Sequence, residues 1–108
     1  MKITSSTLSS YDLSIYHDCE VSQFVVDYAN HKIQIPLKHP KTSDVSISFN
    51  NVKSLSLNID EEWGPGIYVY EITANINDNN EGQFLNISIL LNSGDVIRII
   101  CESIEIEQ

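Results

Sequence analysis

The sequence is poor in cysteine, in basic residues and in long apolar runs. Only Cys19 and Cys101 occur among the 108 residues, without the CxxC spacing of a zinc or redox site, so we expect no metal or redox framework. The N-terminus lacks the apolar segment of a signal peptide, and no apolar run is long enough to cross a bilayer. These absences predict free thiols, a cytoplasmic location and no membrane partner.

Basic residues are scarce enough to set the charge of the whole chain. Fifteen Asp and Glu residues stand against six Lys and Arg residues, which gives a net charge of −9. Each contact with a phosphate backbone requires a cationic side chain, so we expect no nucleic-acid partner. A basic protein partner suits this balance, but the solubility that a high net charge confers explains it equally well. The sequence leaves the oligomeric state open.

No apolar stripe at helical spacing continues over three turns. Any helix should therefore be short and lie near the N-terminus. Hydrophobic residues make up 42% and charged residues 19% of the chain, a balance typical of a folded domain. At this length we expect one domain over residues 1–108 with a core of its own.

Apolar residues instead alternate with polar ones, which is the period of a strand with one buried face. The clearest alternation involves Val45, Ile47 and Phe49, and then Leu55, Leu57 and Ile59. Asn50 and Asn51 between these segments tolerate a left-handed backbone, which favours a hairpin there over a bulge. Two further hairpins are predicted, one around residues 29–31 and one at the Asn-Ser-Gly-Asp turn of residues 92–95.

The last predicted strand changes phase. Ile97, Ile99 and Cys101 share one parity and Ile104 and Ile106 the other, so we expect a bulge near Glu102 and Ser103. Pro36 cannot donate a ladder hydrogen bond, which predicts that its strand lies at a sheet edge. About seven strands joined by turns predict an all-β, single-domain antiparallel meander that forms a sandwich or a partly open barrel.

The segment His17-Asp18-Cys19 carries the residue types of a nucleophile and its base. A Cys nucleophile needs a base within hydrogen-bond reach, and on a strand His17 and Cys19 would share one face with Asp18 on the other. A pocket of these three residues would suit a small hydrolase or a small-ligand-binding β-barrel. The favoured interpretation is structural, with a buried Cys at a strand start beside a His–Asp pair.

The other candidate metal ligands are scattered. His31 lies in a predicted turn and His39 precedes Pro40, so both should be solvated, and scattered histidines do not form a zinc site. The acidic run of residues 60–62 lacks the alternating pattern and final Glu of an EF-hand loop. We therefore expect no metal, no cofactor and no catalytic residue.

The only tryptophan, Trp63, lies in the segment EEWGPG beside Asp60, Glu61 and Glu62. The Gly-Pro-Gly sequence predicts a turn at residues 65–66, at one end of a strand. An aromatic side chain ringed by charge is typical of an interface anchor, so Trp63 and its three acidic neighbours are candidates for partner binding. Alternatively, the indole caps the open end of the sheet, with its N–H bonded to a carbonyl.

Three segments resemble a family of small, acidic, all-β bacterial proteins of unassigned biochemistry, some of which are regarded as immunity proteins of polymorphic toxin systems. The segments are YHDCEVSQFVVDYANHKIQI, EEWGPGIYVYEI and LLNSGDVIRIICESIEIE. They share a His-Asp pair, a Trp-Gly-Pro corner and a Ser-Gly-Asp hairpin, and the resemblance implies no catalytic residue. It implies a non-catalytic binding protein that neutralises a basic toxin by covering its active site.

Overall fold

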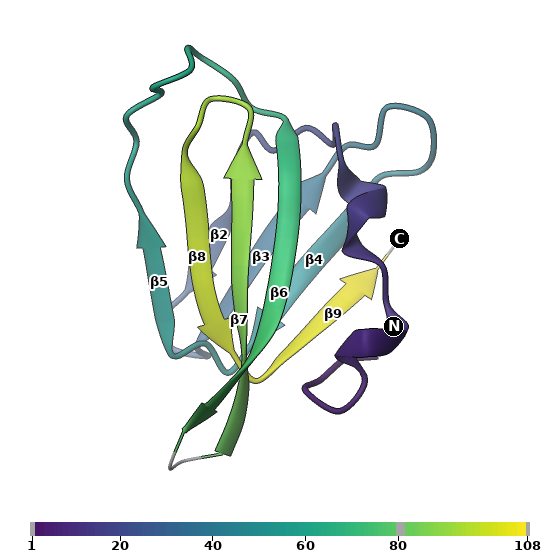
Figure 1. Ribbon diagram of the computed structural model, residues 1–108, viewed down its shortest axis with the longest axis vertical. Coiled ribbons are helices and arrows are strands. Elements are labelled where there is room, and N and C mark those ends of the chain that lie inside the picture. Colours follow the sequence, from purple (N-terminus) through teal and green to yellow (C-terminus); the bar gives the residue numbers. More distant parts are fainter. Residues whose placement is uncertain (1, 80–81, 108) are drawn as a thin grey trace.

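The computed structural model describes residues 2–79 and 82–107. These residues form an all-β sandwich of two antiparallel sheets packed against each other (Figure 1). In the described part of the chain, the first sheet has the strand order β1-β9-β4-β3-β2 and the second the order β5-β8-β7-β6. The predicted all-β class is confirmed, and the sheets are not closed into a barrel.

The strands of the first sheet are β1 (Lys2–Ile3), β2 (Val25–Asp27), β3 (Lys32–Leu37), β4 (Val45–Asn50) and β9 (Ser103–Glu107). Those of the second sheet are β5 (Ser54–Leu57), β6 (Val69–Asn79), β7 (Gly82–Leu91) and β8 (Val96–Cys101). Two short 3₁₀ helices, η1 (Leu8–Ser10) and η2 (Leu13–Tyr16), lie near the N-terminus, where a short helix was expected. No helix among the described residues is long and apolar enough to cross a membrane.

The core lies between the two sheets and follows the predicted alternation in β4. The alternation predicted at Leu55, Leu57 and Ile59 does not mark a buried face, since Leu55 is 38% and Ile59 75% exposed. In β4 the side chains of Val45, Ile47 and Phe49 are buried. They face a second apolar layer on β7 and β8, whose fully buried members include Ile87 and Ile99. Because the inner faces of both sheets are apolar, each sheet removes the other's apolar surface from water.

Two predicted hairpins are confirmed and a third is wrong. β2 pairs with β3, and β7 pairs with β8 across a turn in which Gly94 has a φ of 92°. β4 and β5 do not pair, because β5 belongs to the other sheet and pairs with β8. Asn51 is left-handed as expected, with a φ of 52°. There it turns the chain from one sheet into the other.

The phase change near Glu102 also arises where the chain crosses from one sheet to the other. β8 ends at Cys101 in the second sheet, and β9 begins at Ser103 in the first. The predicted bulge is therefore wrong, since the strand leaves its sheet at Glu102 and buries the opposite parity against the opposite layer. This crossing, together with β1, raises the strand count of the described chain above the expected seven and makes the topology more than a simple meander.

Pro36 does not lie in an edge strand. β3 is flanked by β4 on one side and by β2 on the other. Proline is tolerated because β2 is short. Its Val25 is paired with Gln34, and the next bridge on that side joins Glu20 to Lys38, beyond Pro36. The missing N–H of Pro36 therefore falls in a gap of the ladder.

Candidate functional site

We call residues 60–66 the acidic corner. It contains a tight turn that ends at Gly64. The N–H of Gly64 donates to the carbonyl of Glu61 at 2.9 Å, and both residues have positive φ, 97° and 49° respectively. The hydrogen-bonded turn therefore spans Glu61–Gly64. The turn was predicted at Pro65 and Gly66, so it lies earlier in the chain than expected. Trp63 occupies its third position and is 61% exposed.

The corner is held on the β7–β8 turn by several hydrogen bonds. The backbone N–H of Trp63 donates to the carbonyl of Ser93 at 3.0 Å. A carboxylate oxygen of Asp95 accepts from the N–H groups of Asp60 and Glu61 at 3.0 and 2.9 Å. Asp95 is buried, and these backbone donors lower the pKa of its carboxyl group. The segments EEWGPG and LLNSGD thus form one local unit.

Two glycines allow the close approach of these turns. The Trp63 indole lies on Gly94, where an added Cβ would be 3.1 Å from the indole Cδ2. An added Cβ at Gly66 would overlap the side chain of Asn92, whose Oδ1 accepts the Tyr68 N–H at 3.2 Å. The indole thus packs on Gly94 with one face and is largely exposed on the other, and the anchor interpretation requires such exposure.

Trp63 is the first of three aromatic side chains that contact one another edge to face. Its ring centroid is 6.3 Å from that of Tyr70, at an interplanar angle of 69°. Tyr70 in turn lies 5.9 Å from the His17 ring, at 77°. Tyr70 is 54% exposed and sits at a bulge between Val69 and Glu71. Sequence reasoning missed Tyr70, although an aromatic residue near a Gly-Pro-Gly turn was a usable signal.

His17 and Asp18 lie side by side on the surface. His17 follows η2, its Nδ1 is 2.6 Å from the Tyr70 carbonyl oxygen, and its Nε2 is 3.3 Å from Asp18 Oδ1. Asp18 has a φ of 70°, which a strand does not allow. The predicted strand start is therefore wrong, and His17 and Cys19 do not share a face, since Cys19 is fully buried.

Neither thiol is activated. Burial raises the pKa of Cys19, and the nearby Asp18 carboxylate adds to this effect. Burial also raises the pKa of Cys101 to about 12. Both side chains are therefore thiols near neutral pH, whereas the thiolate is the nucleophile. Within residues 2–79 and 82–107, no three His, Cys, Asp or Glu side chains are grouped so that they could hold a metal ion.

Exposed acids surround the three rings. Four exposed acidic residues each adjoin one of these rings or its turn, namely Asp18, Glu61, Glu62 and Glu71. Asp60 is exposed as well. The sequence has no Lys, Arg or His between Lys53 and Arg98. We call Trp63, Tyr70 and His17, with Asp18, Glu61 and Glu62, the aromatic–acidic surface. Its chemistry suits noncovalent contact with a cationic, partly apolar partner.

The pH dependence of the corner should follow Asp95. Because the pKa of Asp95 is lowered on folding, its carboxylate stabilises the fold at all pH values above about 4, and this stabilisation is lost as the pH falls through the lowered pKa. We expect Asp95→Asn to reduce the melting temperature at neutral pH, whereas Asp44→Asn, an exposed loop change, leaves it nearly unaltered. The difference between wild type and Asp95→Asn should shrink in acid. A difference independent of pH would contradict this role.

Compared with known proteins, the chain matches no protein family, and no curated protein is significantly similar to it.

Proposed function

We propose that this protein is a non-catalytic binding protein, and specifically an immunity protein that neutralises a basic toxin with its aromatic–acidic surface. The observation that carries the proposal is the row of exposed rings, Trp63, Tyr70 and His17, framed by acids. Trp and Tyr are enriched among the residues that contribute most to binding at protein interfaces. The biological role is taken from the resemblance of three segments to a family in which some members are regarded as immunity proteins.

The rigidity of the corner supports binding. Asp95 and Ser93 hold the backbone of residues 60–63 through hydrogen bonds, and Gly94 supports the indole from below. A surface ordered before contact loses little conformational freedom when the partner arrives. A hollow of about 550 Å³ beside the rings, lined by Ser14, His17, Tyr70, Glu71 and Ile72, offers space for a partner side chain.

The charge supports a basic partner. The net charge of −9 attracts a cationic surface over distances of about one Debye length, roughly 8 Å at physiological salt. Such attraction raises the rate of encounter and selects against acidic partners more than it adds affinity. Glu61 and Glu62 lie beside the indole and are exposed. They should therefore raise the rate of association with the partner.

The test first asks whether a gene adjacent to this one encodes a toxin, and then uses that toxin in a catalytically inactive form. We expect Trp63→Ala to weaken binding by about 2 kcal/mol or more, which is roughly 30-fold in Kd, because the largest exposed ring is lost. Tyr28→Ala is the matched control, since Tyr28 is an aromatic residue that is 86% exposed at the opposite end of the sandwich. Isothermal titration calorimetry measures both, and rescue of growth on co-expression with the active toxin provides the cellular readout.

Glu61→Gln with Glu62→Gln should mainly slow association and flatten its salt dependence. Thermal melts accompany each variant. A Trp63→Ala protein that melts far earlier but binds normally once folded would assign the indole to capping and the partner site to another surface. Failure of the wild-type protein to bind the neighbouring gene product, or to protect cells from it, would contradict the immunity role.

A further inference from the structure

A separate cavity lies at the opposite end of the sandwich. In Figure 1 the loop that follows β5 and the β7–β8 turn are at the top, whereas the β2–β3 turn and the start of β5 are at the bottom. There a cavity of about 460 Å³ opens between β2 and β5, which are the outer strands of their respective sheets on this side. This volume lies within the range of small-molecule sites, roughly 300–1,000 Å³.

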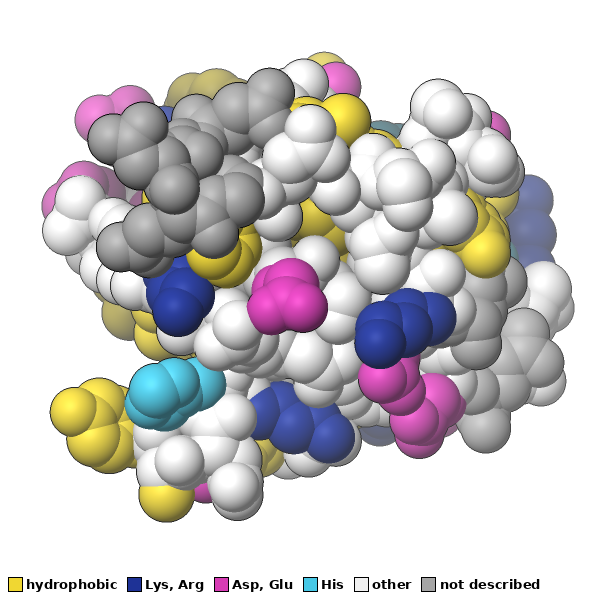
Figure 2. Space-filling model, turned by 90° about the horizontal axis from the view of Figure 1, so that it is seen from below, with side chains coloured by type: hydrophobic (Ala, Val, Ile, Leu, Met, Phe, Trp, Pro, Cys, Tyr) yellow, Lys and Arg dark blue, Asp and Glu magenta, His cyan; other side chains and the backbone are white. Residues whose placement is uncertain are grey.

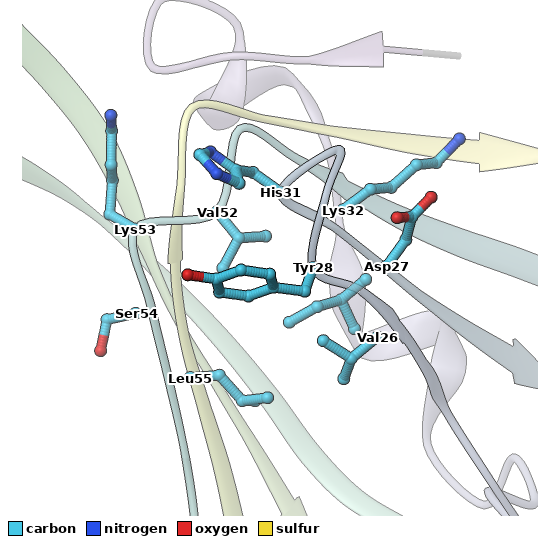
Figure 3. Close-up of a pocket in the computed structure, with 10 residues that line it drawn as sticks. Val26, Asp27, Tyr28, His31, Lys32, Val52, Lys53, Ser54 and Leu55 are labelled. Carbon is cyan, nitrogen blue, oxygen red and sulfur yellow. The ribbon is translucent and has the colours of Figure 1, made fainter.

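The walls of the cavity are mostly apolar and come from both sheets. They include Val26 of β2, Ile33 of β3, Leu55 of β5, and the loop residues Tyr28 and Val52. Figure 3 shows Tyr28 reaching from the end of β2 towards the β5 side, between Val52 and Leu55. Val26 is 49% and Leu55 38% exposed. These side chains therefore leave apolar surface in water that a ligand would cover.

The frame of the cavity is fixed by the backbone. The Val52 N–H donates to the His31 carbonyl at 2.8 Å, which ties the β4–β5 connection to the β2–β3 turn. The next residue, Lys53, donates its N–H to the Ile100 carbonyl at 2.7 Å. His31 itself is left-handed, with a φ of 52°. The cavity is thus formed by turns that are anchored to both sheets, as a preformed site requires.

The charge of the cavity is opposite to that of the protein. Lys32, Lys53 and His31 line it, and Asp27 is the acidic member of the lining. The Asp27 carboxylate accepts hydrogen bonds from the backbone N–H and the side chain of Asn30 and also attracts Lys32, so that one positive charge remains in excess in the lining. In Figure 3, His31 lies between the two lysines at one side of the cavity. Figure 2, a view of this end, shows a histidine flanked by Lys or Arg side chains.

We propose that this cavity binds a medium-chain apolar monocarboxylate. The hydrocarbon body lies between Val26, Val52 and Leu55, and the carboxylate faces the rim formed by His31, Lys32 and Lys53. The Lys53 ammonium lies 5.7 Å from the centre of the Phe84 ring, which is not part of the cavity lining, so the Lys53 side chain would turn from this ring to meet the carboxylate. The net charge of −9 repels anions from the molecule as a whole. The cations that line this site attract an anion at close range and so select it over a neutral or cationic ligand.

Three probes with similar alkyl chains test the ligand class by calorimetry: decanoate, decanol and decyltrimethylammonium. We expect decanoate to bind one site per chain, decanol to bind at least several-fold more weakly, and the cationic probe not to bind. Equal binding of decanoate and decanol would overturn the anionic specificity. Binding of many molecules per chain, or no binding of decanoate, would overturn the site.

Matched variants test the location. Leu55→Glu places a carboxylate in the apolar wall and should weaken decanoate binding about tenfold or more, whereas Ile76→Glu, a similarly exposed change on β6 outside the lining, should not. Lys32→Gln with Lys53→Gln should remove the preference for decanoate over decanol, and Lys41→Gln, in the β3–β4 loop, should preserve it. Circular dichroism melts verify folding. Unchanged decanoate binding by folded Leu55→Glu would refute the assignment.

Discussion

Replacing Phe49 by Ala is expected to lower the free energy of unfolding by about 3–5 kcal/mol, because a buried ring is lost and a cavity remains. Phe49 is 1% exposed. In β4 it is paired with Ile33 on one side and Ile104 on the other, both of which are also buried. Neighbours held in strands on both sides cannot collapse readily into the space. Chemical denaturation followed by circular dichroism measures the loss.

Tyr28→Ala is the control for Phe49→Ala. It also removes an aromatic ring, but from a side chain that is 86% exposed, so stability should change by no more than about 0.5 kcal/mol. A loss of similar size in both variants would mean that the core does not lie between the two sheets. An unchanged dependence on denaturant in Tyr28→Ala would show that the amount of surface exposed on unfolding is unaffected.

The second large effect is expected at Gly94. Gly94→Val forces a β-branched side chain into a backbone with a φ of 92° and towards an indole that an added Cβ would approach to 3.1 Å. Backbone strain and crowding together should lower stability by roughly 2–5 kcal/mol. The indole must also leave its position on the turn. Because Trp63 is the only tryptophan, a change in its fluorescence emission reports that movement directly.

Gly64→Val separates strain from contact. Gly64 has nearly the same φ, 97°, but an added Cβ there would have no neighbour within 4 Å. Gly64→Val should therefore lose about 1–3 kcal/mol from backbone strain and leave the Trp63 indole on Gly94. If both variants had equal stability and equal emission, the contact between Trp63 and Gly94 would have no energetic role.

Local pattern was sufficient for much of the fold. Alternation located β3, β4, β7 and β8 because the side-chain period of two is a property of each strand alone. The turn residues located the hairpin at Gly94 because positive φ has a local chemical signature. The same signature at Asn51 was misread, since a left-handed residue serves equally in a hairpin and in a crossing between sheets.

The candidate site was predictable only in pieces. Local composition marked two separate groups as candidates. One consists of Trp63, Glu61 and Glu62, and the other of His17 and Asp18. The nearby Gly-Pro-Gly turn could have marked Tyr70 as a candidate. Its contacts with Trp63 and His17 could not be predicted, because they depend on how η2 and the corner pack on β6. Exposure of the indole also depends on its seat at Gly94, a residue 31 positions away in a different turn.

The sequence by itself determined the all-β class, the buried faces of β3, β4, β7 and β8, the acidic charge and the absence of a motif for catalysis, because each of these follows from composition or from neighbouring residues. Only the tertiary structure decided which strands share a sheet, which rings meet on the surface, and that the cations Lys32 and Lys53 line one cavity. These features depend on pairing between distant segments. Such pairing is selected by the burial of both sheets together, to which every strand contributes at once.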